Sequence, residues 1–156
     1  MQRPVLLCYD GSDDARTAIR TAGELLAGPA LVATVWDRTH ADLLAAHAPA
    51  LGPAVRQAVD ELDEFAAGEA GRRADEGCAL ARESGFAADP VAVAGSPRVW
   101  AALVELAEER DVALIVLGRR GQSAVSAALF GSVSTGVLHH AQRPVLAVPA
   151  ASAHGP

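Results

Sequence analysis

The sequence predicts an α/β fold in which one open, parallel, five-stranded sheet carries helices on both faces. Five short apolar runs alternate with segments whose apolar residues recur at helical spacing. Right-handed crossovers place such helices over a parallel sheet, and the first and fourth runs are apolar almost throughout, as in strands buried on both faces. The 156 residues, 51% of them hydrophobic, suffice for a single domain and its core.

The first half of the chain reads as strand, helix, strand and helix. Residues 4–9 are a short apolar run, and Ser12 then caps a helix whose first turn is acidic, where the helix dipole favours anions. The apolar residues 30–36 form the second expected strand. A connection rich in alanine and proline, 37–53, leads into a long helix over 54–84. The apolar positions of this helix include Val55, Val59, Leu62, Phe65 and Ala66, and its solvent face carries Asp60, Glu61, Asp63 and Glu64.

The second half repeats the alternation. Residues 87–94 alternate as a strand, and Gly95-Ser96-Pro97 provides a turn glycine, a helix cap and a first-turn proline. After that helix come the strand 112–117, the last helix 131–141 and the strand 145–148. We expect the sheet order 3-2-1-4-5, one domain over residues 1–149 and a flexible tail over 150–156.

Composition excludes several classes of function. The net charge is −6 and no basic cluster is present, so a nucleic-acid surface is not expected. The chain has no lysine, which rules out a Walker-type phosphate loop. Cys8 and Cys78 fit neither a redox pair nor a metal spacing, and no apolar run reaches bilayer length. With no room for a signal peptide before the first strand, these features lead us to expect a cytoplasmic protein that does not enter the membrane.

A glycine-rich stretch follows the fourth predicted strand. Gly118-Arg119-Arg120-Gly121 is separated by nine residues from Gly131-Ser132-Val133-Ser134. In the predicted strand order the first and fourth strands are neighbours, so a ligand crevice is expected between Asp10 and Gly118. Glycine lets backbone amides approach phosphate oxygens, and a helix start carries about half a positive charge. The pattern therefore predicts nucleotide binding without lysine.

These residues resemble the signature of the ATP-binding universal stress proteins, in which G-x-x-G is followed after nine residues by glycine and serine or threonine. The resemblance extends to Tyr9-Asp10-Gly11-Ser12 at the end of the first strand, to the turn at Gly95 and to the closing stretch 143–149. It implies a Rossmann-like fold of the adenine nucleotide alpha hydrolase type. It also implies ATP as the ligand, with magnesium held mainly through the phosphates.

The resemblance assigns roles to individual positions. Asp10 would approach the ribose and adenosine, the backbone of Val35 the adenine edge, and the amides of Gly118 and Gly121 the phosphates. The last helix would present its amino terminus, with hydroxyl donors from Ser132 and Ser134. The full set of expected ligand-binding residues is Cys8, Tyr9, Asp10, Val35, Leu117, Gly118, Arg119, Gly121, Gly131, Ser132, Val133 and Ser134.

Structural alternatives exist for several of these residues. Asp10 is also typical of a turn former, Ser132 of a helix cap, and the pair Arg119 and Arg120 of a solvated loop. The histidines do not complete a metal-ligand set, so metal binding by side chains is not expected.

Three functions remain open at this point. The first is a regulatory ATP-binding module of the stress response, with at most slow hydrolysis. The second is a dimeric stress-related interaction protein without nucleotide, and the third is an adenine-nucleotide hydrolase or transferase, for which no catalytic group is found. A homodimer is expected through the apolar edge strand at 145–148, and an unknown protein partner is implied.

Overall fold

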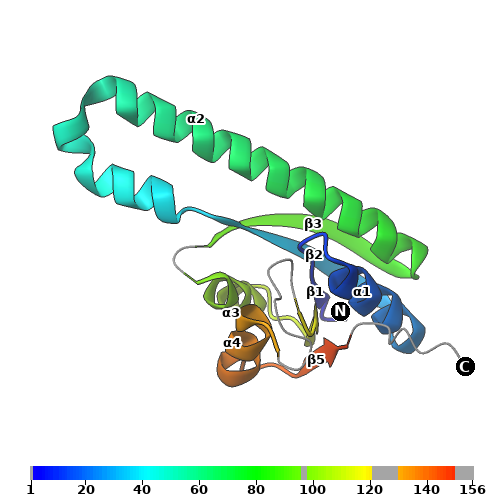
Figure 1. The fold of residues 1–156 in the computed structure, drawn as a ribbon. Coiled ribbons are helices and arrows are strands. Elements are labelled where there is room, and N and C mark those ends of the chain that lie inside the picture. The colour runs from blue at the N-terminus through cyan, green and yellow to red at the C-terminus, as the bar shows by residue number, and fades with distance from the viewer. Residues whose placement is uncertain (1, 96–97, 121–129, 150–156) are drawn as a thin grey trace, which may run out of the picture.

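The computed structural model describes residues 2–95, 98–120 and 130–149, with the backbone alone at 39–41, 45, 48, 49 and 51. Within this part of the chain, strands and helices alternate as predicted (Figure 1). The elements are β1 (Val5–Cys8), α1 (Asp13–Leu25), β2 (Gly28–Asp37), α2 (Thr39–Glu83), β3 (Phe86–Gly95), α3 (Val99–Glu109), β4 (Leu114–Gly118), α4 (Ser132–His140) and β5 (Val145–Val148).

The five strands form one sheet in the order β3-β2-β1-β4-β5, and every neighbouring pair is parallel. This confirms the predicted fold class and strand order. β1 lies at the centre, where Leu7 is in register with Val32 of β2 and with Val116 of β4. The chain first winds toward β3 and then returns to the other side of β1 for β4 and β5.

Each face of the sheet is covered by two helices and has its own core. Successive side chains of a strand point to opposite faces, so the fully buried neighbours Leu6 and Leu7 enter different cores. Leu7 packs with Ile19 of α1 and Ala81 of α2, and Leu6 packs with Leu103 of α3 and further α3 and α4 residues. Burial of each such leucine stabilises the fold by about 1.5–3 kcal/mol.

The largest departure from expectation is the helical arm, which we define as residues 39–69. Most of the expected connection is helical, because α2 begins at Thr39 and its alanine and leucine residues favour helix. Gly52, with φ 78° and ψ 173°, separates two helical segments, and Pro53 follows as a favoured first-turn residue. The two segments form a hairpin that projects away from the sheet (Figure 1).

The root of the arm rests on an extension of two strands. β1 ends opposite Ala33, whereas β2 and β3 remain paired as far as Asp37 and Gly95. Arg38, at the end of this ribbon, forms an ion pair with Asp63 at 3.0 Å. Asp63, expected on the solvent face, is therefore only partly exposed.

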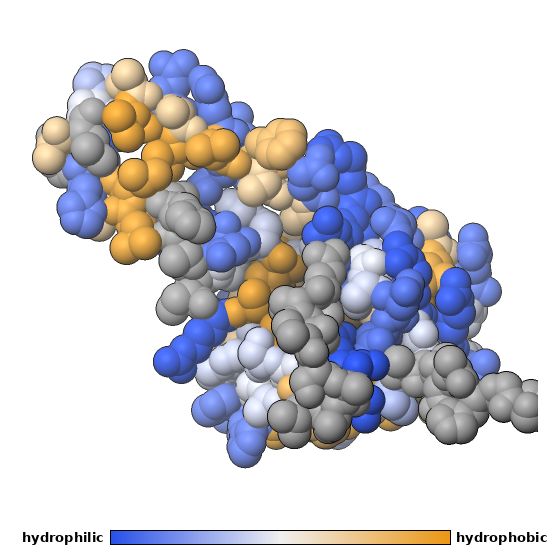
Figure 2. Space-filling model, in the orientation of Figure 1, coloured by the Kyte–Doolittle hydropathy of each residue, from blue (hydrophilic) through white to orange (hydrophobic). Residues whose placement is uncertain are grey.

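Two apolar residues of the long helix do not reach a core. Leu62 is 65% exposed and Phe65 66% exposed, although Val59 in the same part of α2 is buried, because Leu62 and Phe65 lie to one side of the helical face that Val59 shares with Ala70 and Ala74. This part of α2 projects from the main body of the sheet (Figures 1 and 2). Regular burial begins at Ala70 and continues through Ala74 and Cys78 as the helix crosses the sheet. Residues of low volume on this face let the helix lie close to the strands.

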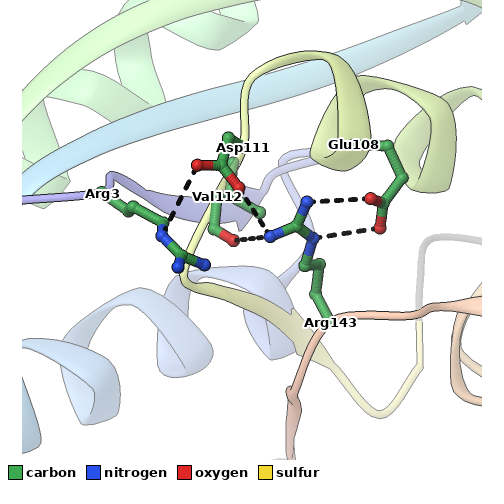
Figure 3. Close-up of polar contacts among 5 residues, drawn as sticks. All are labelled: Arg3, Glu108, Asp111, Val112 and Arg143. Carbon is green, nitrogen blue, oxygen red and sulfur yellow. Dashed lines mark hydrogen bonds and ion pairs between the residues drawn. The ribbon is translucent and has the colours of Figure 1, made fainter.

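A cluster of ion pairs around Arg143 lies at the amino-terminal end of the strands, on the side of the sheet away from the arm (Figure 3). Arg143 precedes β5 and donates two hydrogen bonds to Glu108 of α3, at 3.1 and 2.9 Å. It also donates to Asp111 at 2.7 Å, and Asp111 in turn pairs with Arg3 at 3.5 Å. Bidentate arginine–carboxylate pairs are geometrically specific, so this cluster fixes how β5 enters the sheet.

We expect Arg143→Met to lower the melting temperature by a few degrees at neutral pH. The Arg143 hydrogen bonds hold the pKa of Glu108 below its usual range. A carboxyl group whose folded-state pKa is lowered stabilises the fold above its unfolded pKa of about 4.3, and this contribution is lost as the pH falls through the folded-state value. The difference in melting temperature between the wild type and Arg143→Met, measured by thermal unfolding, should therefore become smaller as the pH falls from about 7 to about 3. A gap that is independent of pH would contradict this role for Glu108.

Candidate functional site

The loop after β1 is a tight turn stabilised by its own side chains. Asp10 Oδ1 accepts a hydrogen bond from the Ser12 amide at 2.9 Å, and Ser12 Oγ accepts one from the Ala15 amide at 3.2 Å. Gly11 has the positive φ of 80° that such a turn requires. The turn-forming alternative for Asp10 is therefore realised, and it places this carboxylate at the carboxyl edge of the sheet.

Gly118, the last residue of β4, has a steric reason to be glycine. A Cβ at this position would lie 2.7 Å from the carbonyl carbon of Asp14 and 2.9 Å from its oxygen. The first turn of α1 thus packs directly against the end of β4. Asp14 Oδ2 also accepts a hydrogen bond from the Arg120 amide at 3.1 Å, with Arg120 Nε at 3.5 Å. This contact joins the loops that follow β1 and β4.

The backbone of Arg119 is held from two sides. Its amide donates to Val148 O at 2.8 Å, and its carbonyl accepts from the Gly131 amide at 3.0 Å and from Ser134 Oγ at 2.7 Å. These bonds bring the start of α4 to the end of β4. Within the described residues, the buried Nε of Arg119 has no hydrogen-bond acceptor.

The amino terminus of α4 differs from that of α1. Gly131 caps α4 without a side-chain hydrogen bond, and the first turn contains no acidic residue. In α1, by contrast, Ser12 caps the helix and two aspartates occupy the first turn. Because the first amides of a helix have no intrahelical acceptors, α4 presents a donor-rich end that no carboxylate of its own first turn neutralises.

The two expected hydroxyl donors of α4 lie in different surroundings. Ser132 is exposed at the helix start. Ser134 is 2% exposed, and its hydroxyl lies within hydrogen-bond distance of Arg119 O and Gly131 O. In this structure Ser134 therefore holds the loop, and of these two hydroxyls only that of Ser132 belongs to an exposed residue.

Val35 lies where β2 has passed the end of β1. The Tyr9 amide donates to Ala33 O at 2.9 Å, so the backbone groups of Ala33 point toward β1. A strand repeats every two residues, so the backbone of Val35 has the same orientation. β1 ends before it pairs with Val35, which leaves this backbone edge directed at the space above β1.

Cys8 and Leu117 belong to the core beneath the site. Leu117 is 3% exposed, and Cys8 packs against the same α3–α4 cluster. Burial raises the pKa of the Cys8 thiol to about 12, with a further contribution from Asp10. The sulfur is therefore protonated at neutral pH and is not a thiolate nucleophile.

Tyr9 points to the other face of the sheet and joins three elements. Its hydroxyl donates to Glu76 Oε1 of α2 at 2.5 Å, and Arg16 of α1 donates to the same oxygen at 2.7 Å. Arg16 also donates to Gly11 O at 2.6 Å. The Tyr9 side chain is thus part of a network that supports the β1 loop from behind.

The structure brings together most of the predicted residues and adds others. Asp10, Gly118, Arg119 and the start of α4 converge at the carboxyl edge of β1 and β4, whereas Gly121 lies outside the described residues. The supporting residues that sequence reasoning missed are Asp14, Arg16 and Glu76. Asp14 was visible only as an acidic residue in a helix start, and its contact with Arg120 spans 106 positions. In the described part of the chain no cluster of three metal-ligating side chains occurs.

The protonation of Tyr9 gives a direct test of this network. Burial, followed by the Glu76 hydrogen bond, raises the pKa of Tyr9 to about 12. A tyrosine whose pKa is raised in the folded state stabilises the fold at pH values below its ordinary pKa of about 10. This contribution is lost as the pH rises through 12. Tyr9 is the one tyrosine of the chain, so tyrosinate absorbance reports it alone.

We expect the absorbance titration to have its midpoint near 12. Glu76→Gln should lower that midpoint, although burial keeps it above the ordinary value. Circular dichroism over the same pH range separates ionisation from unfolding. A wild-type midpoint near 10 in folded protein would refute the network.

Comparison with known proteins agrees with the fold. The model of the universal stress protein family matches residues 1–149. The universal stress protein Rv1996 of Mycobacterium tuberculosis is 55% identical over 40 residues, which cover 26% of this chain and 13% of the relative.

Two solved structures extend over nearly the whole chain. Hypothetical protein MJ0577 has a TM-score of 0.78 and 23% identity, covering 98% of this chain and 99% of its own. A universal stress protein in complex with cAMP has a TM-score of 0.62 and 26% identity, covering 96% of this chain and 98% of its own.

Among the helices that the structure describes, none combines the length and the apolar character that a membrane span requires. The chain belongs to the universal stress protein family.

Proposed function

We propose that this chain is a regulatory module that binds an adenine nucleotide, ATP with magnesium, at the carboxyl edge of β1 and β4. The observation that carries this proposal is the convergence of three segments: the Asp14–Arg120 contact joins the start of α1 to the β4 end, and the Arg119 backbone joins that end to the start of α4, which has no side-chain cap. Such an edge is where open α/β sheets bind ligands. A 26% identical universal stress protein in complex with cAMP supports an adenine-containing ligand.

The nucleoside half of the ligand fits the side formed by β1 and β2. The backbone edge of Val35 offers a donor and an acceptor to adenine, and Asp10 lies at the neighbouring strand end for the ribose hydroxyls. The strand ends beneath these positions are held by the core residues Cys8 and Leu117 and by the hydrogen bond of Tyr9 to Glu76.

The phosphates fit the side formed by β4 and α4. The amides of Ser132 and Val133 lie in the first turn of α4, where helix amides have no intrahelical acceptor, and the exposed Ser132 could add its hydroxyl. The Arg119 guanidinium adds a charged donor, since its buried Nε has no acceptor in the described residues, whereas Arg120 approaches Asp14. Gly118, Gly121 and Gly131 would keep this side free of bulky side chains, and Ser134 fixes the loop.

Magnesium would be held mainly by the phosphate oxygens. The chain supplies no three-residue ligand cluster within its described part, and magnesium ordinarily keeps several waters when it binds with a nucleotide. The ion would balance phosphate charge in a site that has no lysine. The protonated Cys8 and the absence of an identified general base favour binding over fast hydrolysis.

A thermal-shift assay tests the nucleotide proposal. Magnesium and ATP at about 100 times the dissociation constant should stabilise the chain by about 2.7 kcal/mol, which corresponds to about 5–10 °C. Gly131→Val should abolish the shift because a branched side chain enters the phosphate side. AMP and cAMP, measured in parallel, show whether the phosphate chain contributes to affinity.

Two glycine variants serve as controls. Gly118→Ala should lower the melting temperature even without nucleotide, because its Cβ meets the Asp14 backbone. Gly71→Ala should leave binding unchanged and raise the melting temperature by a few degrees, since no atom lies within 4 Å of the added Cβ and alanine favours the middle of a helix by about 0.5–1 kcal/mol. No shift with any adenine nucleotide, or equal affinity in Gly131→Val, would overturn the proposal.

We also propose that β5 pairs with β5 of a second copy. β5 is an edge strand of four residues, and Val145, Leu146 and Ala147 are only partly buried. Light scattering should give a dimer mass at micromolar concentration, and Leu146→Lys should reduce it by introducing a charge at this edge. Unfolding curves would show whether the variant remains folded. A monomeric wild type would refute this mode of assembly.

A further inference from the structure

The helical arm gathers exposed apolar side chains. Leu43 and Leu44 are 57% and 38% exposed on its first helical segment, and Leu62 and Phe65 are 65% and 66% exposed on the second. Figure 2 shows hydrophobic residues concentrated on the projecting end of the molecule. These are four of the seven large hydrophobic residues exposed in the described part of the chain. Such a concentration is typical of an interaction surface.

The same arm carries most of the net charge of the protein. Residues 39–69 contain six carboxylates and one arginine, Arg56, against a net charge of −6 for the whole chain. Glu61 and Glu69 lie four residues before and after Phe65, so they flank it on the same side of the helix. Glu69 contacts Arg72 in an exposed pair three residues apart, and such pairs contribute little to stability. A stronger cationic partner can therefore replace Arg72.

We propose that the arm binds an amphipathic helix with basic flanks on another protein. A third helix laid along Leu62 and Phe65 would remove both side chains from water and bring its cations to Glu61 and Glu69. These carboxylates are about 12 Å apart along the helix axis, so the partner needs two lysines or arginines at a matching interval. Binding of this kind is a common mode of helix recognition.

Charge decides between the possible occupants of this surface. A second copy of the chain would bring an equally acidic arm against this one, and an anionic membrane would repel it. An amphipathic helix with basic flanks would cover the exposed apolar side chains with its apolar face and pair the acidic side chains with its cations. The proposal is independent of nucleotide binding, because no residue of the arm belongs to the candidate site.

A designed peptide of about 18 residues tests the proposal with the full-length protein. It carries leucines along one helical face and two lysines spaced like Glu61 and Glu69, and a second peptide has glutamates in place of those lysines. Fluorescence anisotropy should show at least about tenfold tighter binding of the lysine peptide. A scrambled peptide of the same composition should bind as weakly as the glutamate peptide.

Two double variants and one matched control locate the binding. Leu62→Gln with Phe65→Gln, and Glu61→Gln with Glu69→Gln, should each weaken binding of the lysine peptide by about tenfold or more. Glutamine keeps good helix propensity, so circular dichroism should be unchanged. Leu25→Gln alters an equally exposed leucine, 66% exposed at the end of α1, and should leave affinity unchanged.

Several outcomes would overturn this assignment. They are equal binding of the lysine and glutamate peptides, no binding of the lysine peptide up to about 1 mM, and an equal loss of affinity in Leu25→Gln. A fall in assembly mass on replacing Leu62 and Phe65, measured by light scattering without peptide, would assign the surface to a second copy instead.

Discussion

The site depends on the parallel pairing of β1 with β4. Leu7 opposite Val116 fixes the register of these strands, and both lie between apolar cores that exclude water from the sheet. Because the chain winds away from β1 in both directions, no helix crosses directly from β1 to β4. The loops after the two strands therefore leave the same edge, one toward α1 and the other toward α4, and a ligand can lie between them.

Backbone groups, rather than cationic side chains, dominate this edge. The Arg119 amide and carbonyl are both occupied by bonds to β5 and α4, so the position of the Gly131 amide is fixed before any ligand arrives. Ser134 adds a buried hydroxyl bond to the same carbonyl. A fixed helix start would hold an anion, under the proposed function, without the entropy cost of ordering a long lysine side chain, and the chain has no lysine.

Local sequence patterns predicted the strands, whereas the roles of Gly118 and Ser134 depend on contacts with residues distant in the sequence. The apolar runs and the turn residues predicted the alternating strands and helices, the expected sheet order agrees with the structure, and Ser12 caps its helix as expected. The steric role of Gly118 depends on Asp14, and the inward hydroxyl of Ser134 depends on where the β4 loop returns. Phe65 is exposed because it lies off the helical face that Val59 shares with Ala70 and Ala74, and the apolar pattern alone did not show which of two neighbouring faces would be buried.

One helix connects the β1 loop with the arm. Glu76 of α2 accepts from Tyr9 and from Arg16, and Arg16 also donates to Gly11 O, so α2 is anchored to the turn that positions Asp10. Between Phe65 and Glu76 the helix has no interruption, because its non-helical residue is Gly52. These two residues are about 16 Å apart along the helix axis. Phe65 and Glu76 therefore lie on one continuous helical segment, which joins the apolar side chains of the arm to the contacts that hold the β1 loop.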